Sequence, residues 1–112
     1  MNSLRNKVTL IGNLGADPEL KEFESGTKLA RFSIATNETY TNKGGEKVQE
    51  TQWHNIVAWG KVAEIMEKYL SKGNEVAIEG KLVNRSYKDS EGASKYTSEV
   101  HVNDFLIIGG SK

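Results

Sequence analysis

Residues 49–73, QETQWHNIVAWGKVAEIMEKYLSKG, decide the fold because the hydrophobic period changes within them. The first part, residues 49–59, is rich in Thr, Trp, Ile and Val, which predicts a strand. After Gly60, apolar residues return at the three- and four-residue spacings of one face of an α-helix. This stripe consists of Val62, Ile65, Met66, Tyr69 and Leu70. The stretch therefore predicts a strand followed by a helix of about three turns, with Gly73 placed to form its left-handed C-terminal cap.

Strand patterns lie on both sides of this stretch. Two alternating apolar segments precede it, and after Gly73 the alternation of apolar and polar residues resumes. Two polar, glycine-containing segments separate strands and predict loops. The predicted strands are residues 8–14, 29–36, 49–59, 76–83 and 96–102, with a short apolar run at 105–108, and the loops are residues 41–45 and 89–94.

The order of three strands, one helix and two strands predicts an all-β fold, a five-stranded Greek-key barrel of the OB type with one α-helix between strands 3 and 4. The apolar stripe of the helix predicts that it plugs one end of the sheet. We expect one domain over residues 1–108 and a flexible C-terminal end at 109–112. A barrel of this size is filled by its own side chains, so a ligand must lie on the outer face or between loops.

Composition excludes several classes of function. The chain has 112 residues, no cysteine and no apolar run of about 18 residues. The first seven residues also lack the apolar stretch of a signal peptide. We therefore expect no disulfide, no thiolate metal site, no membrane partner and a cytoplasmic location. Fifteen basic residues balance fifteen acidic ones, and this zero net charge argues against a nucleic-acid binder unless basic residues gather locally.

Nine aromatic residues are present, and the placement of four suggests a function. Trp53 and Trp59 lie six residues apart in one predicted strand, which puts both on the same face about 20 Å apart. Tyr40 and Tyr87 each lie at the mouth of a predicted loop. Aromatic rings at such positions favour stacking with nucleic-acid bases of any sequence, at roughly 1–3 kcal/mol per base. The alternative is that both tryptophans belong to the core.

The separated motifs of the chain resemble those of the bacterial single-stranded DNA-binding proteins. The resemblance covers nearly the whole chain and is most specific around the helix. The matching stretches are Asn6-Lys7-Val8, Gly12-Asn13-Leu14-Gly15, Asp17-Pro18-Glu19, residues 32–36, residues 40–47, Gln52-Trp53-His54, Trp59-Gly60-Lys61-Val62-Ala63-Glu64, Tyr69-Leu70, Lys72-Gly73, Ile78-Glu79-Gly80 and Tyr96-Thr97-Ser98-Glu99-Val100.

This resemblance implies sequence-independent binding and protection of single-stranded DNA in replication, recombination and repair. It implies that Tyr40, Trp53, Trp59 and Tyr87 stack on bases, although three of the four differ in type from the best-studied members. Basic residues near the DNA path would be Lys7, Lys43, Lys61, Lys72 and Arg85. Ser86 falls where the family often has another basic residue, so one phosphate contact is expected to be missing.

The resemblance also implies partners beyond DNA. The family usually forms homotetramers, and His54 matches a position at the subunit interface. Members usually continue into a flexible linker and an acidic tip that recruits replication and repair enzymes. The sequence ends at Lys112 without either. We therefore expect such enzymes as partners only if a tail of this kind is missing from this chain, and we expect no cofactor.

Two other classes of function remain to be weighed. A metal-dependent nuclease needs clustered Asp, Glu or His ligands, but His54 and His101 are isolated in the sequence. Asp17, Asp89 and Asp104 fall in predicted turns, where aspartate usually supports the backbone. A protein-interaction module, such as a primosome-type OB subunit, would need fewer aromatic residues at its loop mouths. The sequence therefore favours a DNA-binding protein that is not an enzyme.

Overall fold

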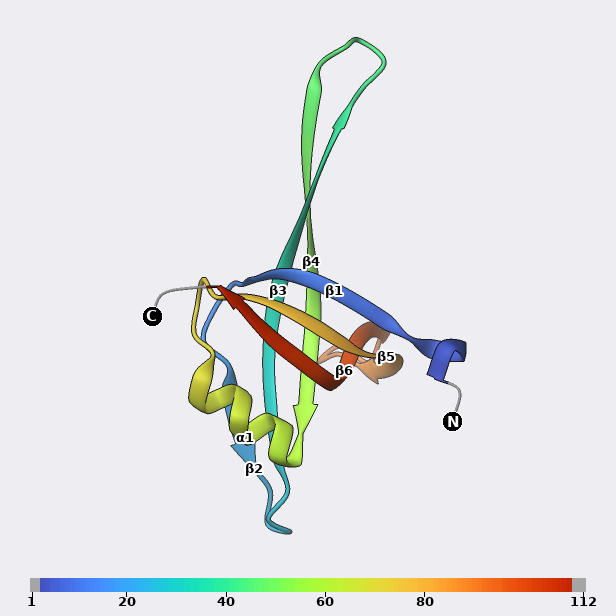
Figure 1. Ribbon diagram of the computed structural model, residues 1–112. Coiled ribbons are helices and arrows are strands. Elements are labelled where there is room, and N and C mark those ends of the chain that lie inside the picture. The colour runs from blue at the N-terminus through green and yellow to red at the C-terminus, as the bar shows by residue number, and fades with distance from the viewer. Residues whose placement is uncertain (1–2, 110–112) are drawn as a thin grey trace.

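The computed structural model describes residues 3–109, and its strands close into a barrel (Figure 1). A short 3₁₀ helix precedes six strands and one α-helix, which lies between β4 and β5. The elements are η1 (Ser3–Asn6), β1 (Val8–Leu14), β2 (Glu19–Glu22), β3 (Lys28–Thr41), β4 (Lys47–Trp59), α1 (Gly60–Tyr69), β5 (Glu75–Lys88) and β6 (Ser94–Gly109). The predicted domain end at residue 108 falls within β6, and residues 110–112 of the predicted flexible end lie outside the described residues.

Five of the strands form the barrel and the sixth lies beside it. The sheet order is β1-β5-β6-β4-β3-β2, and a further pairing of β1 with β3 closes the ring. At the closure Leu14 is paired with Ile34. The contact between β4 and β6 is parallel, with Asn55 opposite Glu99. The predicted five-stranded OB barrel with one α-helix is thus confirmed.

The short strand β2 was not predicted from the sequence. All four of its residues are exposed, and it pairs only with β3, with Glu19 opposite Arg31. A strand with no buried face leaves no alternation of apolar and polar residues. The segment therefore carried no periodic signal beyond the turn marked by Asp17 and Pro18.

Buried residues of the five barrel strands fill the barrel. The largest fully buried side chains include Ile34 of β3, Ile56 of β4 and Ile78 of β5, and Met66 of α1 joins the same cluster. The helix therefore packs against one end of the barrel, as the sequence predicted (Figure 1).

The buried stripe of α1 is narrower than predicted. Ala63, Met66 and Leu70 are buried, whereas Ile65 and Tyr69 are 43% and 58% exposed. The helix meets the barrel along one line, and the small Ala63 side chain lies within this contact. The sequence prediction wrongly assigned Ile65 and Tyr69 to the packed face of the helix.

The predicted cap at Gly73 was also placed too close to the helix. The helix ends at Tyr69, and Leu70 is already extended because its side chain turns into the core. Gly73 does adopt a positive φ of 92°, but it does so in the turn before β5, where its N–H donates to the carbonyl of Leu14.

Two hairpins extend from the barrel, and each turn is organised by one side chain. In the β3–β4 turn, the Asn42 side-chain oxygen accepts from the N–H groups of Gly44 and Glu46 at 2.9 and 3.0 Å. In the β5–β6 turn, the Asp89 side-chain oxygen accepts from the N–H groups of Glu91 and Ala93, both at 2.9 Å. Figure 1 shows the β3–β4 hairpin reaching well beyond the barrel body. The polar segments predicted as loops are therefore ordered turns at the ends of long strands.

Candidate nucleic-acid interface

All four aromatic residues singled out in the sequence lie open on the surface. Tyr40, Trp53, Trp59 and Tyr87 are 47%, 61%, 45% and 51% exposed. The alternative that the two tryptophans belong to the barrel core is therefore wrong. Ile56 and Ala58, which alternate with them in β4, are the residues buried inside.

The indole ring of Trp53 lies against Gly15, the first residue after β1. A Cβ built on Gly15 would lie 2.6 Å from the ring of Trp53. Only glycine lets the indole approach the backbone this closely. The ring is thus supported on one side and remains largely open to solvent.

Trp59 is in contact with two other rings. Phe23 stacks on it with ring centroids 6.2 Å apart and an interplanar angle of 21°. The His101 ring lies 6.5 Å from it at a tilt of 44°. The sequence reasoning missed Phe23, although an aromatic residue in a turn next to Gly26 was a usable signal.

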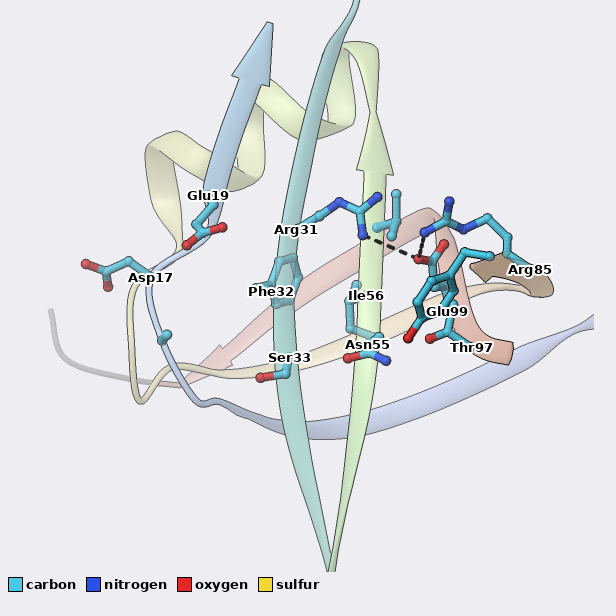
Figure 2. A pocket seen from close by; sticks show the side chains of 13 residues that line it. Asp17, Glu19, Arg31, Phe32, Ser33, Asn55, Ile56, Arg85, Thr97 and Glu99 are labelled. Atoms are coloured by element: carbon cyan, nitrogen blue, oxygen red, sulfur yellow. Dashed lines mark hydrogen bonds and ion pairs between the residues drawn. The ribbon is translucent and has the colours of Figure 1, made fainter. Parts of the chain in front are cut away.

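A groove of about 470 Å³ runs over β3, β4, β5 and β6. We call this surface the groove face and define it by its polar and aromatic lining residues. These are Arg31, Ser33, Asn55, Arg85, Tyr87, Thr97 and Glu99. Asp17 and Glu19 also line the groove, and Glu19 is the cross-strand partner of Arg31, which lies between Glu19 and Arg85 in Figure 2. The groove lining therefore holds two basic side chains and three acidic ones, with Glu99 included.

Glu99 is in contact with both arginines and is itself buried, with its side chain 4% exposed. Its Oε2 accepts from Arg85 Nη2 at 2.8 Å and from Arg31 Nη1 at 3.4 Å, and its Oε1 lies 3.1 Å from His101 Nε2. Burial raises the pKa of Glu99, but hydrogen bonds from Arg85 and His101 and the charges of Arg85 and Arg31 outweigh it. The net result is a pKa below the usual value, which keeps this carboxylate ionised.

The predicted basic residues are dispersed over the molecule, and only Arg85 lines the groove. Lys7 pairs with Glu79 of β5 at 3.5 Å, Lys43 lies in the β3–β4 turn, and Lys61 is in the first turn of α1. The backbone N–H of Lys72 donates to Asp17 at 2.7 Å. Their contacts with DNA remain predictions. Arg31 was missed because nothing in the sequence showed that β3 and β5 bring two arginines together.

Tyr40 stands apart from the groove face. In β3 the even-numbered residues Phe32 and Ile34 point into the barrel, and Tyr40 shares their side of the strand, opposite Val48. Trp53 lies opposite Ala35 and so takes the other side. On the β3–β4 hairpin, Tyr40 and Trp53 therefore occupy opposite faces.

The remaining candidate residues have structural partners. His54 is half-buried and its Nε2 lies 2.9 Å from the hydroxyl of Thr36, while its place at a subunit interface remains a prediction. Asp17 and Asp89 accept backbone N–H groups, and Asp104 accepts from the N–H of Phe105, in agreement with the backbone role predicted for them. Within residues 3–109, no cluster of three His, Cys, Asp or Glu side chains could hold a metal ion.

The fold and this face define a class, the OB-fold barrels that display open rings and basic side chains on an outer surface. Comparison with known sequences then identifies the family. Residues 5–108 match the Single-strand binding protein family, and the chain belongs to it. This is a family of binding proteins rather than enzymes, as the sequence predicted.

Individual relatives agree with this assignment. A single-stranded DNA-binding protein 1 of Chlorobaculum tepidum is 46% identical over 93% of this chain, and a single-stranded DNA-binding protein of Bacteroides thetaiotaomicron is 46% identical over 92%. That of Neisseria meningitidis is 40% identical over 94%. The chain spans 60–65% of the length of these relatives.

A solved structure supports the fold independently. The Plasmodium falciparum SSB in complex with ssDNA superposes with a TM-score of 0.89 at 32% identity, over 97% of this chain and 98% of that one. Over residues 3–109, none of the helices combines the length and apolar character needed to cross a membrane.

Proposed function

We propose that this protein binds and protects single-stranded DNA without reading its sequence, in replication, recombination and repair. The observation that carries the proposal is the exposure of Trp53, Trp59 and Tyr87, together with a groove that is lined by Tyr87 and two arginines. Single-strand binders combine stacking rings with a basic path for the phosphates. The names of the relatives, and the ssDNA in the similar Plasmodium structure, support the same ligand.

The groove lining holds two arginines beside three acidic residues, so contacts with phosphate in the groove depend on these two cations. The groove places Arg31 and Arg85 on neighbouring surfaces of β3 and β5, and both side chains are about half exposed. Phosphate contacts from such cations do not depend on base identity. Binding should therefore weaken as salt rises, because counterions released from the DNA then bind back more readily.

The direct test is a fluorescence titration. Poly(dT) added at low salt should quench the emission of the two exposed tryptophans, and added salt should restore it. A DNA duplex of equal charge is the control, because its stacked bases cannot lie on the rings, and we expect it to quench much less. Absence of quenching by poly(dT), or equal quenching by the duplex, would argue against the proposal.

We further propose that the chain forms a homotetramer, with His54 at a subunit interface. A second outer surface supports self-association. Ile11, Ala77 and Leu106 are aligned across β1, β5 and β6, and Ile11 and Leu106 are 54% and 66% exposed. We call this row the aliphatic face. Exposed aliphatic side chains aligned in this way are typical of a protein–protein contact.

The size of the assembly is tested by light scattering on the purified protein. We expect four times the mass of one chain, with and without oligo(dT). A mass of one or two chains would contradict the tetramer and would leave the proposed DNA binding in place.

A further inference from the structure

A buried acid lies under the two arginines of the groove face. The Glu99 side chain is 4% exposed, whereas those of Arg31 and Arg85 are 49% and 48% exposed. The three residues come from β6, β3 and β5, so the sequence separates them widely. The carboxylate is therefore covered by the groups that would meet a ligand in the groove.

The carboxylate holds three groups at once. Both guanidinium groups bind its Oε2, and His101 is bound to its Oε1. Figure 2 shows the two arginines reaching the carboxylate from different strands. The ring of His101 in turn lies beside Trp59. Glu99 thus links the two arginines of the groove to one of the exposed aromatic rings.

A carboxylate repels phosphate, so charge alone predicts that Glu99 opposes DNA binding in the groove. Its burial changes this expectation, because an incoming phosphate reaches the guanidinium groups first. Two guanidinium groups and one carboxylate leave a net positive charge. Each arginine has five N–H donors and uses one nitrogen on Glu99, so donors remain for a second acceptor.

Fixing the arginines before binding has a thermodynamic advantage. A free arginine side chain loses rotamer freedom when it binds a ligand, whereas one already held in place loses less. Without the shared carboxylate, the like charges of Arg31 and Arg85 would also repel one another. Glu99 both orients the two cations and keeps them close together.

We propose that Glu99 is a positioning residue, which holds Arg31 and Arg85 together as a preformed site for one backbone phosphate of single-stranded nucleic acid. The inference rests on the proposed function and deepens it by naming the residues that make the subsite. Tyr87, which lines the same groove, would place a base beside that phosphate.

The test replaces Glu99 by glutamine, which removes the charge and keeps the size. Charge alone predicts that Glu99→Gln tightens binding to oligo(dT). Positioning predicts the opposite, a loss of about fivefold in affinity. The plot of log affinity against log salt should also become shallower by up to about 0.7, as one phosphate contact is lost.

A matched control is Glu79→Gln. Glu79 is also a carboxylate paired with a cation, Lys7, but it lies outside the groove lining. This variant removes the same charge and should bind oligo(dT) as tightly as the unaltered protein, or slightly more tightly. Thermal melting followed by circular dichroism shows whether each variant is folded at the temperature of the titration.

A double-mutant cycle separates positioning from general loss of structure. In an Arg85→Gln background, Glu99→Gln should cost much less affinity than it does alone, since the pair it organises is already broken. Should Glu99→Gln fail to fold, the double variant Arg31→Lys with Arg85→Lys tests the same idea at constant charge. We expect this double variant to lose about fivefold in affinity for oligo(dT). An ammonium group lacks the planar pair of donors with which a guanidinium group binds phosphate, so it cannot bind the carboxylate and a phosphate in the same way.

The outcomes are distinct. If the unaltered protein does not bind oligo(dT), the proposed function fails. If it binds, and Glu99→Gln binds equally or more tightly, the positioning role is overturned while the proposed function stands. If the variant with Arg31→Lys and Arg85→Lys bound oligo(dT) as tightly as the unaltered protein, the positioning role would be overturned as well.

Discussion

The groove face and the aliphatic face lie on the same small barrel but present different chemistry. On the first, the lining holds two arginines, three acidic residues, the amide of Asn55 and the open ring of Tyr87. On the second, outward positions hold Ile11, Ala77 and Leu106 in a row across three strands. The alternation of strand residues leaves both surfaces outside the core, so neither set of residues is needed to fill the barrel. The difference indicates two kinds of partner, a charged strand with flat bases and another apolar protein surface.

The largest effect is expected on the aliphatic face. Leu106→Glu places a charge at the β6 end of the row, and in a symmetric contact two such charges would meet at a cost of several kcal/mol. We expect the assembly to dissociate, with a lower mass in light scattering. Because Leu106 is 66% exposed, the chain should remain folded.

Ile65→Glu is the control for this substitution. Ile65 is an exposed aliphatic residue of α1, 43% accessible, and it lies outside the row. Its replacement should leave the mass unchanged. If Leu106→Glu kept the mass of the unaltered protein, the aliphatic face would not be the subunit contact.

The next effect is expected at the rings of the groove side. Trp53→Ala and Trp59→Ala should each weaken binding of oligo(dT) by about 1–3 kcal/mol, as one stacked base is lost. Trp59→Ala also removes the ring that contacts Phe23 and His101, so its effect should be the larger. Filter binding or fluorescence anisotropy with labelled oligo(dT) measures both without relying on tryptophan emission.

Tyr96→Ala provides a comparison within the same barrel. Tyr96 is 80% exposed, but it pairs with Ser86 on the face of the β5–β6 hairpin away from Tyr87. We expect little change in affinity. Equal binding by the two tryptophan variants and the unaltered protein would favour the interaction-module interpretation.

A smaller effect is expected in the salt dependence. Arg31→Gln should lower the slope of log affinity against log salt by about 0.7, the value for one phosphate contact with a single strand. Lys7→Gln should lower it less, because Lys7 is paired with Glu79 and lies outside the groove lining. Equal slopes for the two variants would show that the DNA path is not confined to the groove face.

The barrel was predictable because its strands and helix leave periodic signals. Ile56 and Ala58 alternate with Trp53 and Trp59 and are buried as the period requires, although Val57, on the side of the tryptophans, is buried as well. The strand β2 left no signal because none of its residues is buried. Periodicity thus reports which residues face a core, and it is silent where a strand has no buried side.

The site was less predictable, since its charges meet only through the fold. Arg31 and Arg85 are 54 positions apart in the sequence, and they converge because β3 and β5 both border the groove. Glu99, which joins them, reads in the sequence as one more residue of an alternating strand. Conversely, Lys43 and Lys61 resemble family positions but lie at the ends of different elements. Resemblance identified positions, whereas the structure showed which of them are neighbours.

The smallest effect is expected in the pH dependence of thermal stability. The pKa of Glu99 lies below its usual value, since the arginine and histidine contacts outweigh the effect of burial. A carboxyl whose folded pKa is depressed stabilises the fold above its unfolded pKa, and this stabilisation is lost as pH falls through the folded pKa. Glu99→Gln should therefore melt below the unaltered protein at neutral pH, by about 5 °C. The gap should close as the solution is made more acidic than the ordinary carboxyl pKa. Melting curves from neutral to acidic pH measure it, and a gap of constant size would contradict a stabilising role for the ionised carboxylate of Glu99.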